Sequence, residues 1–295
     1  MTGAPSDRAA LDALCARIRA SVRKNPDGAI DVARERRAME RFGALPPVAE
    51  GTRVEQSKLA GLSCDVIAPE NLGANAPRIL YFHGGAFALG SPETHRAMLS
   101  HLAKACAARV WCVDYRRAPE HPFPAAIDDA LAAWKELAQD GPAFVMGDSC
   151  GGNLSVVTMQ RAKAEGAPLA RGMVLLSPWV DLTLGGESIK TNAERDPLIR
   201  EGDSRAYAAL YLNGRSPRDP LASPLFGDSS GLPPTYVQAA RGEILLDDAR
   251  RFAEKMRAKL DVFDLDLHVW QLLAGLVPEA DEAIARIGTF VRTTP

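Results

Sequence analysis

The sequence predicts an α/β protein in which a mostly parallel central sheet carries helices on both faces. From residue 78 onward, short apolar runs alternate with segments whose apolar residues recur at helical spacing. The short runs are apolar throughout rather than at every second residue, which is typical of strands buried on both faces of a parallel sheet. Alternation of this kind indicates helices packed above and below one sheet.

The elements can be assigned in chain order. Before the alternation, two helices and two short strands are expected, at 7–23, 27–41, 52–58 and 63–67. The alternation then gives the strands 78–82, 109–115, 143–147, 172–177, 234–240 and 262–269. The intervening and final helices are expected at 94–107, 125–138, 151–164, 246–259 and 279–292.

One long segment, residues 183–233, interrupts this order. It is rich in Gly, Pro, Ser and Asp, holds one helical piece at 202–212, and is too long for an ordinary connection. We expect it to rise above the sheet and pack on the N-terminal helices. The predicted organisation is a helical cap, residues 1–45 and about 183–217, on an α/β domain, residues 46–182 and 218–295.

Composition excludes several classes of function. The 295 residues are 46% hydrophobic, which is enough for one large core and a small subdomain. Lys and Arg (35) nearly balance Asp and Glu (37), so nucleic acid is not an expected partner. The five cysteines form no C-x-x-C pair, so no metal site or disulfide framework is expected. Without a signal-peptide pattern or a long apolar run, we expect a cytoplasmic protein with no membrane span.

The segment "AFVMGDSCGGNL", residues 143–154, places a serine between glycines at the end of an expected strand. Its G-x-S-x-G pattern, followed by a helix, is typical of a nucleophile elbow, in which small residues permit a tight turn that exposes the serine. The N-terminus of the following helix favours negative charge at the same point. Ser149 is therefore the candidate nucleophile. Cys150 is a weaker alternative, because the elbow directs residue 149 at the substrate.

A serine nucleophile needs a base and an acid. Proteins with this elbow order the triad Ser, acid, His, and His268 is the only histidine after Ser149. The acid is expected just past strand 234–240, where Glu243 stands in the loop. Asp247 and Asp248 are the alternatives, although they fit better as acidic residues in the first turn of the next helix.

An oxyanion hole would complete the site with backbone N–H donors. "YFHGGAF" ends the first buried strand, where such a fold places its second donor, and the residue after the nucleophile offers another. The predicted set is Gly84, Gly85, Ala86 and Cys150; the last three supply N–H groups, while Gly84 shapes the loop. The same stretch does not fit G-x-G-x-x-G, which argues against a nucleotide-binding oxidoreductase.

Together these residues resemble the hormone-sensitive-lipase-like family of α/β-hydrolases, the microbial carboxylesterases with H-G-G-G and G-D-S-A-G-G-N motifs. The similarity also covers "DYRRAPEHPFPAAIDDA", "SPWVDLT", "DPLASPL" and "GEILLDDARRFAEKM". It implies an α/β-hydrolase fold with a helical cap and the triad Ser149, Glu243 and His268. The family's cap likewise combines an N-terminal helical segment with an insertion after the sixth strand.

The resemblance implies a serine carboxylesterase that cleaves short- to medium-chain esters through an acyl-enzyme, without metal or cofactor. Lactone hydrolysis on the same machinery is an alternative, as is a ligand-binding protein without turnover if His268 is misplaced. Members often dimerise through the last strand and helix, so a homodimer is also an expectation. The sequence departs from the family at Ala86 for glycine, at Cys150 for alanine, and in a shorter segment before His268.

Overall fold

The computed structural model describes residues 8–21 and 30–295. Its sheet has the strand order β1-β2-β4-β3-β5-β6-β7-β8, with β1 and β2 antiparallel to their neighbours and β3 to β8 mutually parallel. The strands are β1 (Thr52–Leu59), β2 (Leu62–Pro69), β3 (Arg78–Phe82), β4 (Arg109–Val113), β5 (Phe144–Asp148), β6 (Met173–Leu176), β7 (Thr235–Ala240) and β8 (Lys259–Phe263). This is the α/β-hydrolase sheet that the sequence predicts.

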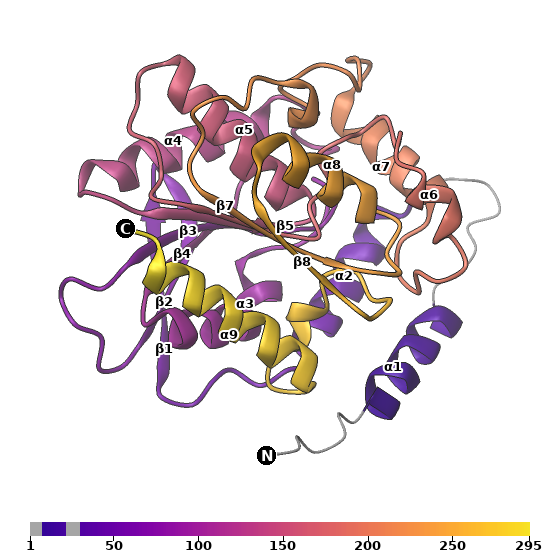
Figure 1. Ribbon diagram of the computed structural model, residues 1–295, viewed down its shortest axis with the longest axis horizontal. Helices are drawn as coiled ribbons and strands as arrows, with labels where there is room; N and C mark the ends of the chain where they lie inside the picture. Colours follow the sequence, from indigo (N-terminus) through magenta and orange to yellow (C-terminus); the bar gives the residue numbers. More distant parts are fainter. Residues whose placement is uncertain (1–7, 22–29) are drawn as a thin grey trace.

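Helices cover both faces of the sheet (Figure 1). The helices are α1 (Arg8–Ser21), α2 (Val32–Gly43), α3 (Pro92–Cys106), α4 (Ala125–Gln139), α5 (Cys150–Ala164), α6 (Ser188–Thr191), α7 (Glu201–Leu212), α8 (Leu246–Met256) and α9 (Pro278–Thr293). The layer of α3 and α9 covers one face, and the layer of α4, α5 and α8 covers the other. Two 3-10 turns, η1 (Pro224–Phe226) and η2 (Trp270–Leu273), complete the fold.

The central strands are buried on both faces, as their apolar runs predict. In β3, Ile79 and Tyr81 pack in the core under α3 and α9, while Leu80 and Phe82 pack in the core under α4 and α5. All four side chains are fully buried. The carboxyl ends of β3, β5, β6 and β7 therefore lie side by side in a rigid sheet, which is where a site can be built from consecutive loops.

The prediction of a strand over 262–269 is wrong. Helix α8 ends at Met256 rather than at 259, because Arg257 adopts a left-handed φ of 51° and closes the helix through its N–H. The strand then starts at Lys259, pairs with β7 from Tyr236↔Lys259 to Ala240↔Phe263, and ends there. His268 consequently lies in a loop, and the shortened segment still contains a complete edge strand.

The N-terminal helices approach the insertion between β6 and β7. Arg19 of α1 donates to the carbonyl oxygens of Glu194 and Arg195 (2.9 Å for Arg195). Helix α2 begins at Val32, later than predicted, because Asp31 caps it by accepting the Arg34 N–H; the predicted start at residue 27 lies outside the described residues. The contacts of Arg19 agree with a cap that combines the N-terminal segment with the insertion. The boundaries of the two domains remain a prediction.

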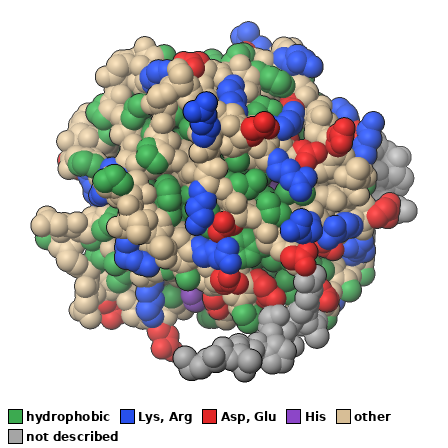
Figure 2. Space-filling model, in the orientation of Figure 1, with side chains coloured by type: hydrophobic (Ala, Val, Ile, Leu, Met, Phe, Trp, Pro, Cys, Tyr) green, Lys and Arg blue, Asp and Glu red, His purple; other side chains and the backbone are tan. Residues whose placement is uncertain are grey.

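None of the helices in the described ranges is long and apolar enough to cross a bilayer. On the face shown in Figure 2, lysines and arginines are interspersed with aspartates and glutamates. Strand β8 forms one edge of the sheet, so the homodimer expected through β8 and α9 would use a free edge, and it remains a prediction.

Candidate active site

The turn between β5 and α5 has the geometry of a nucleophile elbow. Ser149 sits alone between the strand and the helix with φ 52° and ψ −120°, a strained conformation for a residue other than glycine. Its N–H donates to Leu176 O at 2.9 Å, and its carbonyl accepts from Trp179 N at 3.0 Å. The backbone of Ser149 is thus fixed from both sides by the end of β6 and the segment that follows it.

The glycines around Ser149 are required sterically. A Cβ added at Gly147 would overlap the carbonyl oxygen of Gly151, and one added at Gly151 would overlap the carbonyl oxygen of Phe82. Helix α5 therefore starts in direct contact with the ends of β5 and β3. This close approach explains why the sequence places glycines two residues before and after the serine.

Asp148 joins the elbow to the loop after β3. Its Oδ1 accepts from Tyr81 Oη and from the Gly84 N–H, both at 2.9 Å, and lies 3.2 Å from His95 Nε2. Burial raises the pKa of Asp148, but the charge and hydrogen bond of His95 and the hydrogen bond of Tyr81 outweigh it, so the pKa lies below its usual 3.8. Because the Gly84 N–H is already paired, this residue shapes the loop and offers no free donor.

The three residues after Gly84 form an unusual run of left-handed backbone. Their φ values are 120° for Gly85, 53° for Ala86 and 60° for Phe87. Among the described residues, the N–H groups of Gly85 and Cys150 donate to no atom, while the N–H of Ala86 lies beside the Cys150 sulfur. Unpaired N–H groups on the loop after β3 and at the start of α5 are what the predicted oxyanion hole requires.

The Cys150 thiol is unsuited to act as the nucleophile. The side chain is fully buried, and burial raises the pKa of its thiol to about 12, against an opposing effect of the Phe87 N–H. A thiol must ionise to attack or to bind a metal, so this one stays protonated and unreactive. The alternative nucleophile considered from the sequence therefore receives no support from the geometry.

Glu243 and His268 meet at the other side of the site. His268 Nδ1 lies 2.5 Å from Glu243 Oε2, and Glu243 Oε1 accepts from the Ala240 N–H at 2.9 Å. Glu243 is fully buried and His268 is 5% exposed. Since an ionised carboxylate only accepts hydrogen bonds, Nδ1 carries the imidazole proton and Nε2 is left as a free base.

The surroundings of His268 favour its protonated form. Burial lowers the pKa of the imidazole, but the hydrogen bond and charge of Glu243, with the charges of Asp196 and Asp148, outweigh burial. The pKa of His268 therefore lies above its ordinary value of 6.5. A base of this strength can accept a proton from a serine as negative charge leaves the hydroxyl.

The end of β6 contacts both the elbow and the loop that carries His268. Leu176 O accepts from the Ser149 N–H, and the next residue, Ser177, accepts the Val269 N–H on its Oγ at 3.3 Å. Within the described part of the chain, no hydrogen bond joins Ser149 Oγ to the imidazole. In ligand-free sites this contact is often long and tightens when substrate binds.

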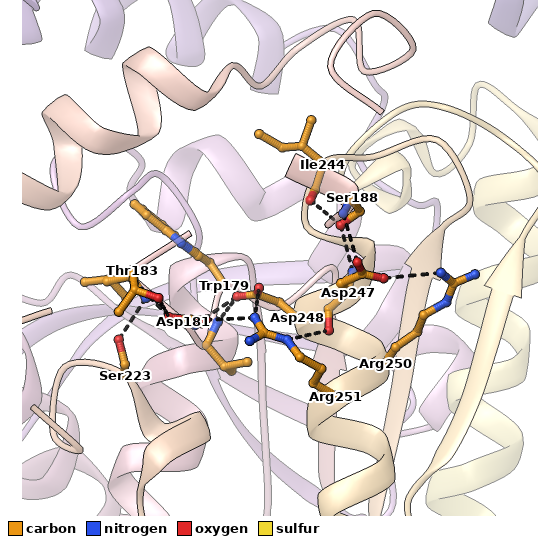
Figure 3. Close-up of polar contacts among 12 residues, drawn as sticks. Trp179, Asp181, Thr183, Ser188, Ser223, Ile244, Asp247, Asp248, Arg250 and Arg251 are labelled. Atoms are coloured by element: carbon orange, nitrogen blue, oxygen red, sulfur yellow. Dashed lines mark hydrogen bonds and ion pairs between the residues drawn. The ribbon is translucent and has the colours of Figure 1, made fainter. Parts of the chain in front are cut away.

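The two alternative acids serve other partners (Figure 3). Asp247 Oδ2 accepts from the Ser188 N–H at 2.8 Å, while Oδ1 faces Arg250. Asp248 Oδ2 accepts from the N–H groups of Val180 and Asp181, at 3.0 and 2.9 Å. Neither carboxylate bonds to His268, so the geometry favours Glu243 as the acid.

Three polar residues of the insertion, for which the sequence analysis predicts no role, hold the loop that carries the acid. Ser188 Oγ donates to Ile244 O, Asn192 Nδ2 donates to Glu243 O at 2.9 Å, and Asp196 Oδ2 accepts the Ile244 N–H at 2.9 Å. Asp196 is 5% exposed, and burial raises its pKa to about 6. The Asp-Pro pair at 196–197, a turn-forming dipeptide, is the one local signal that could have identified it.

Comparison with known proteins agrees with this architecture. The profile of a family described by its α/β-hydrolase fold matches residues 79–270. An acetyl-hydrolase from Streptomyces hygroscopicus is 42% identical over 73% of this chain and 75% of its own length. An esterase from Acinetobacter venetianus is 38% identical over 86% of this chain and 87% of its own length. The crystal structure of an esterase from the bacterial hormone-sensitive lipase family superimposes with a TM-score of 0.91, at 38% identity, over 100% of this chain and 99% of that one.

Proposed function

The chain belongs to the hormone-sensitive-lipase family of α/β-hydrolase-fold carboxylic ester hydrolases, and we propose that it cleaves its substrates through an acyl-enzyme formed on Ser149. The observation that carries this mechanism is the buried Glu243–His268 hydrogen bond of 2.5 Å, which leaves His268 Nε2 as a base beside the elbow. The same bond argues against a ligand-binding protein without turnover, since there the imidazole would need no fixed tautomer.

In the first half-reaction, Ser149 Oγ attacks the ester carbonyl carbon while His268 Nε2 takes the hydroxyl proton. The carbonyl oxygen becomes an oxyanion, which the N–H groups of Gly85, Ala86 and Cys150 stabilise. When the carbon–oxygen bond to the alcohol breaks, His268 returns the proton to the leaving oxygen. Glu243 keeps its hydrogen bond to Nδ1 throughout and stabilises the imidazolium.

In the second half-reaction, water takes the place of the alcohol. His268 removes a proton from the water as it attacks the acyl carbon, and then protonates Ser149 Oγ as the ester bond to the serine breaks. The products are a carboxylic acid and the free enzyme. Every proton in this cycle passes through His268 Nε2, which acts in turn as base and as acid.

The surroundings of Ser149 support a preference for short acyl chains. Ser149 is 7% exposed, and large buried rings pack against the oxyanion loop: Phe87, a residue of this loop, stacks on Tyr211 of α7 at 3.8 Å and lies 6.2 Å from Trp179. Long chains would have to displace these buried rings. The name acetyl-hydrolase, given to the Streptomyces relative, agrees with a small acyl group.

The test is hydrolysis of p-nitrophenyl acetate, butyrate, octanoate and laurate by the wild type and by Ser149→Ala. We expect kcat/KM to be highest for acetate or butyrate and to fall with chain length, and Ser149→Ala to lose about 10⁴-fold or more. A p-nitrophenol burst before steady state would report the acyl-enzyme. Equal rates for the two proteins would contradict the proposal, and a flat chain-length series would contradict the acyl preference alone.

A further inference from the structure

Cys150 is the first residue of α5, and it contacts the loop after β3 that carries the other proposed oxyanion-hole donors. Its own N–H is one of the proposed donors, and its side chain lies against the loop after β3. There Sγ accepts the Phe87 N–H at 3.2 Å and lies 3.8 Å from Tyr115 Oη, which itself donates to His83 O at 2.7 Å. The thiol is therefore the acceptor that links the start of α5 to the far end of the oxyanion loop.

This loop needs an external restraint. Ala86 and Phe87 are non-glycine residues with left-handed φ values, a conformation that persists only when the surroundings impose it. Phe87 is held at its carbonyl by the Ala118 N–H (2.8 Å) and at its ring by Tyr211. Its N–H has Cys150 Sγ as its hydrogen-bond partner among the described residues, in a fully buried place.

We propose that the Cys150 thiol is a positioning group that holds the oxyanion loop against the nucleophile elbow, so that the N–H groups of both point at one oxygen. This inference rests on the proposed function, and it gives the cysteine side chain a role of its own beside that of its N–H. The thiol takes no part in proton transfer or bond formation. It acts as a hydrogen-bond acceptor, and its burial keeps it protonated and protected from oxidation.

An alanine at this position would leave the Phe87 N–H without its acceptor. A buried donor without a partner is costly, so the loop would shift to find another contact, and the donors would no longer converge on the oxyanion. The shift would weaken binding of the tetrahedral intermediate more than binding of the substrate, whose carbonyl oxygen makes weaker hydrogen bonds. The expected loss therefore falls on kcat rather than on KM.

The experiment compares Cys150→Ala and Cys150→Ser with the wild type. Cys150→Ser retains an acceptor near the sulfur position, so it should recover most of what alanine loses. Cys106→Ala is the matched control, because Cys106 is also a buried thiol whose pKa burial raises to about 12, but it lies at the end of α3. The measurements are kcat and KM for p-nitrophenyl acetate, the inhibition constant of phenylboronic acid, and Tm.

We expect Cys150→Ala to lower kcat about tenfold, equivalent to about 1.4 kcal/mol, with KM changed less than about twofold. The inhibition constant of phenylboronic acid, whose tetrahedral serine adduct places an oxygen in the oxyanion hole, should rise by a similar factor. Cys106→Ala should lower Tm without changing either quantity. This split separates positioning from a loss of stability, which would move Tm alone.

Two results would overturn the inference while leaving the proposed function intact: an active wild type with unchanged kcat and boronate affinity in Cys150→Ala, or a serine variant as impaired as the alanine variant. A wild type that hydrolyses none of the esters would contradict the proposed function and this inference with it. The two failures are thus distinguished by the wild-type rate.

Discussion

The two halves of the site are held in different ways. The half that contains Ser149 and the oxyanion loop is fixed by short motifs at the ends of adjacent strands, where an added Cβ at Gly147 or Gly151 would overlap backbone. The half that contains Glu243 and His268 lies in the loops that follow β7 and β8. It is held by side chains of the insertion, including Asn192 and Asp196. Close backbone packing thus adds to the hydrogen bonds that hold the first half, whereas the second half depends on hydrogen bonds from a distant segment.

This difference predicts which substitutions damage chemistry and which damage structure. In the acid–base half, polar atoms can be exchanged for near-isosteres without changing the packing. In the nucleophile half, a single added methyl group should be enough to displace the chain.

The first prediction concerns Glu243→Gln, which should lower kcat about 10³-fold with a smaller change in KM. An amide that donates to Nδ1 would hold His268 in the wrong tautomer, and the imidazolium would lose its counter-charge. Steady-state hydrolysis of p-nitrophenyl butyrate measures the effect, with Glu254→Gln on the exposed side of α8 as the control. A loss below tenfold would indicate that another carboxylate supports His268.

The second prediction concerns Gly151→Ala, which should reduce the free energy of unfolding by about 3 kcal/mol or more. The new Cβ would overlap the Phe82 carbonyl oxygen, so α5 would have to move away from β3. Urea denaturation measures the loss. Gly202→Ala is the control, because its Cβ would meet nothing within 4 Å and alanine favours the α7 helix. Equal stability of both variants would show that the close approach is not restrictive.

The third prediction concerns the pH dependence of the wild type. His268 acts as a base only when neutral, and Glu243, Asp196 and Asp148 outweigh burial to raise its pKa above 6.5. The kcat/KM value should therefore fall as the pH drops through this pKa, with the midpoint of the acidic limb above 6.5. An acidic limb centred below that value would mean that these carboxylates do not act on the imidazole.

The fourth and smallest effect is expected for Asp196→Asn. Removing this charge should lower the pKa of His268 and move the acidic limb to lower pH, since Asp196 is one of the groups that raise it. The Asp196 carboxylate accepts hydrogen bonds from backbone N–H groups, and the NH₂ of an amide could not accept them. The free energy of unfolding should therefore fall by about 1–3 kcal/mol. Asp140→Asn, at an exposed carboxylate just after α4, is the control for both readouts; an unmoved limb would confine Asp196 to a structural role.

Much of this arrangement follows from local sequence. The apolar runs place β3 to β7 correctly, and the G-x-S-x-G pattern identifies the elbow, because a tight strand-to-helix turn permits few side chains around it. The prediction for the last strand is wrong, because the apolar alternation of "VFDLDLHV" continues past Phe263, where β8 ends. Its true limits depend on the left-handed Arg257 and on pairing with β7, neither of which local periodicity encodes.

Local sequence is enough to predict the order of strands along the chain, the strained serine and the glycine-rich loop after β3, because steric limits on the backbone act between near neighbours. The contact of Glu243 with His268, the other partners of Asp247 and Asp248, and the Phe87 N–H bond to the Cys150 sulfur follow only from the folded chain. Those outcomes depend on hydrogen bonds between residues far apart in the chain, whose geometry exists only once the sheet has brought its loops together.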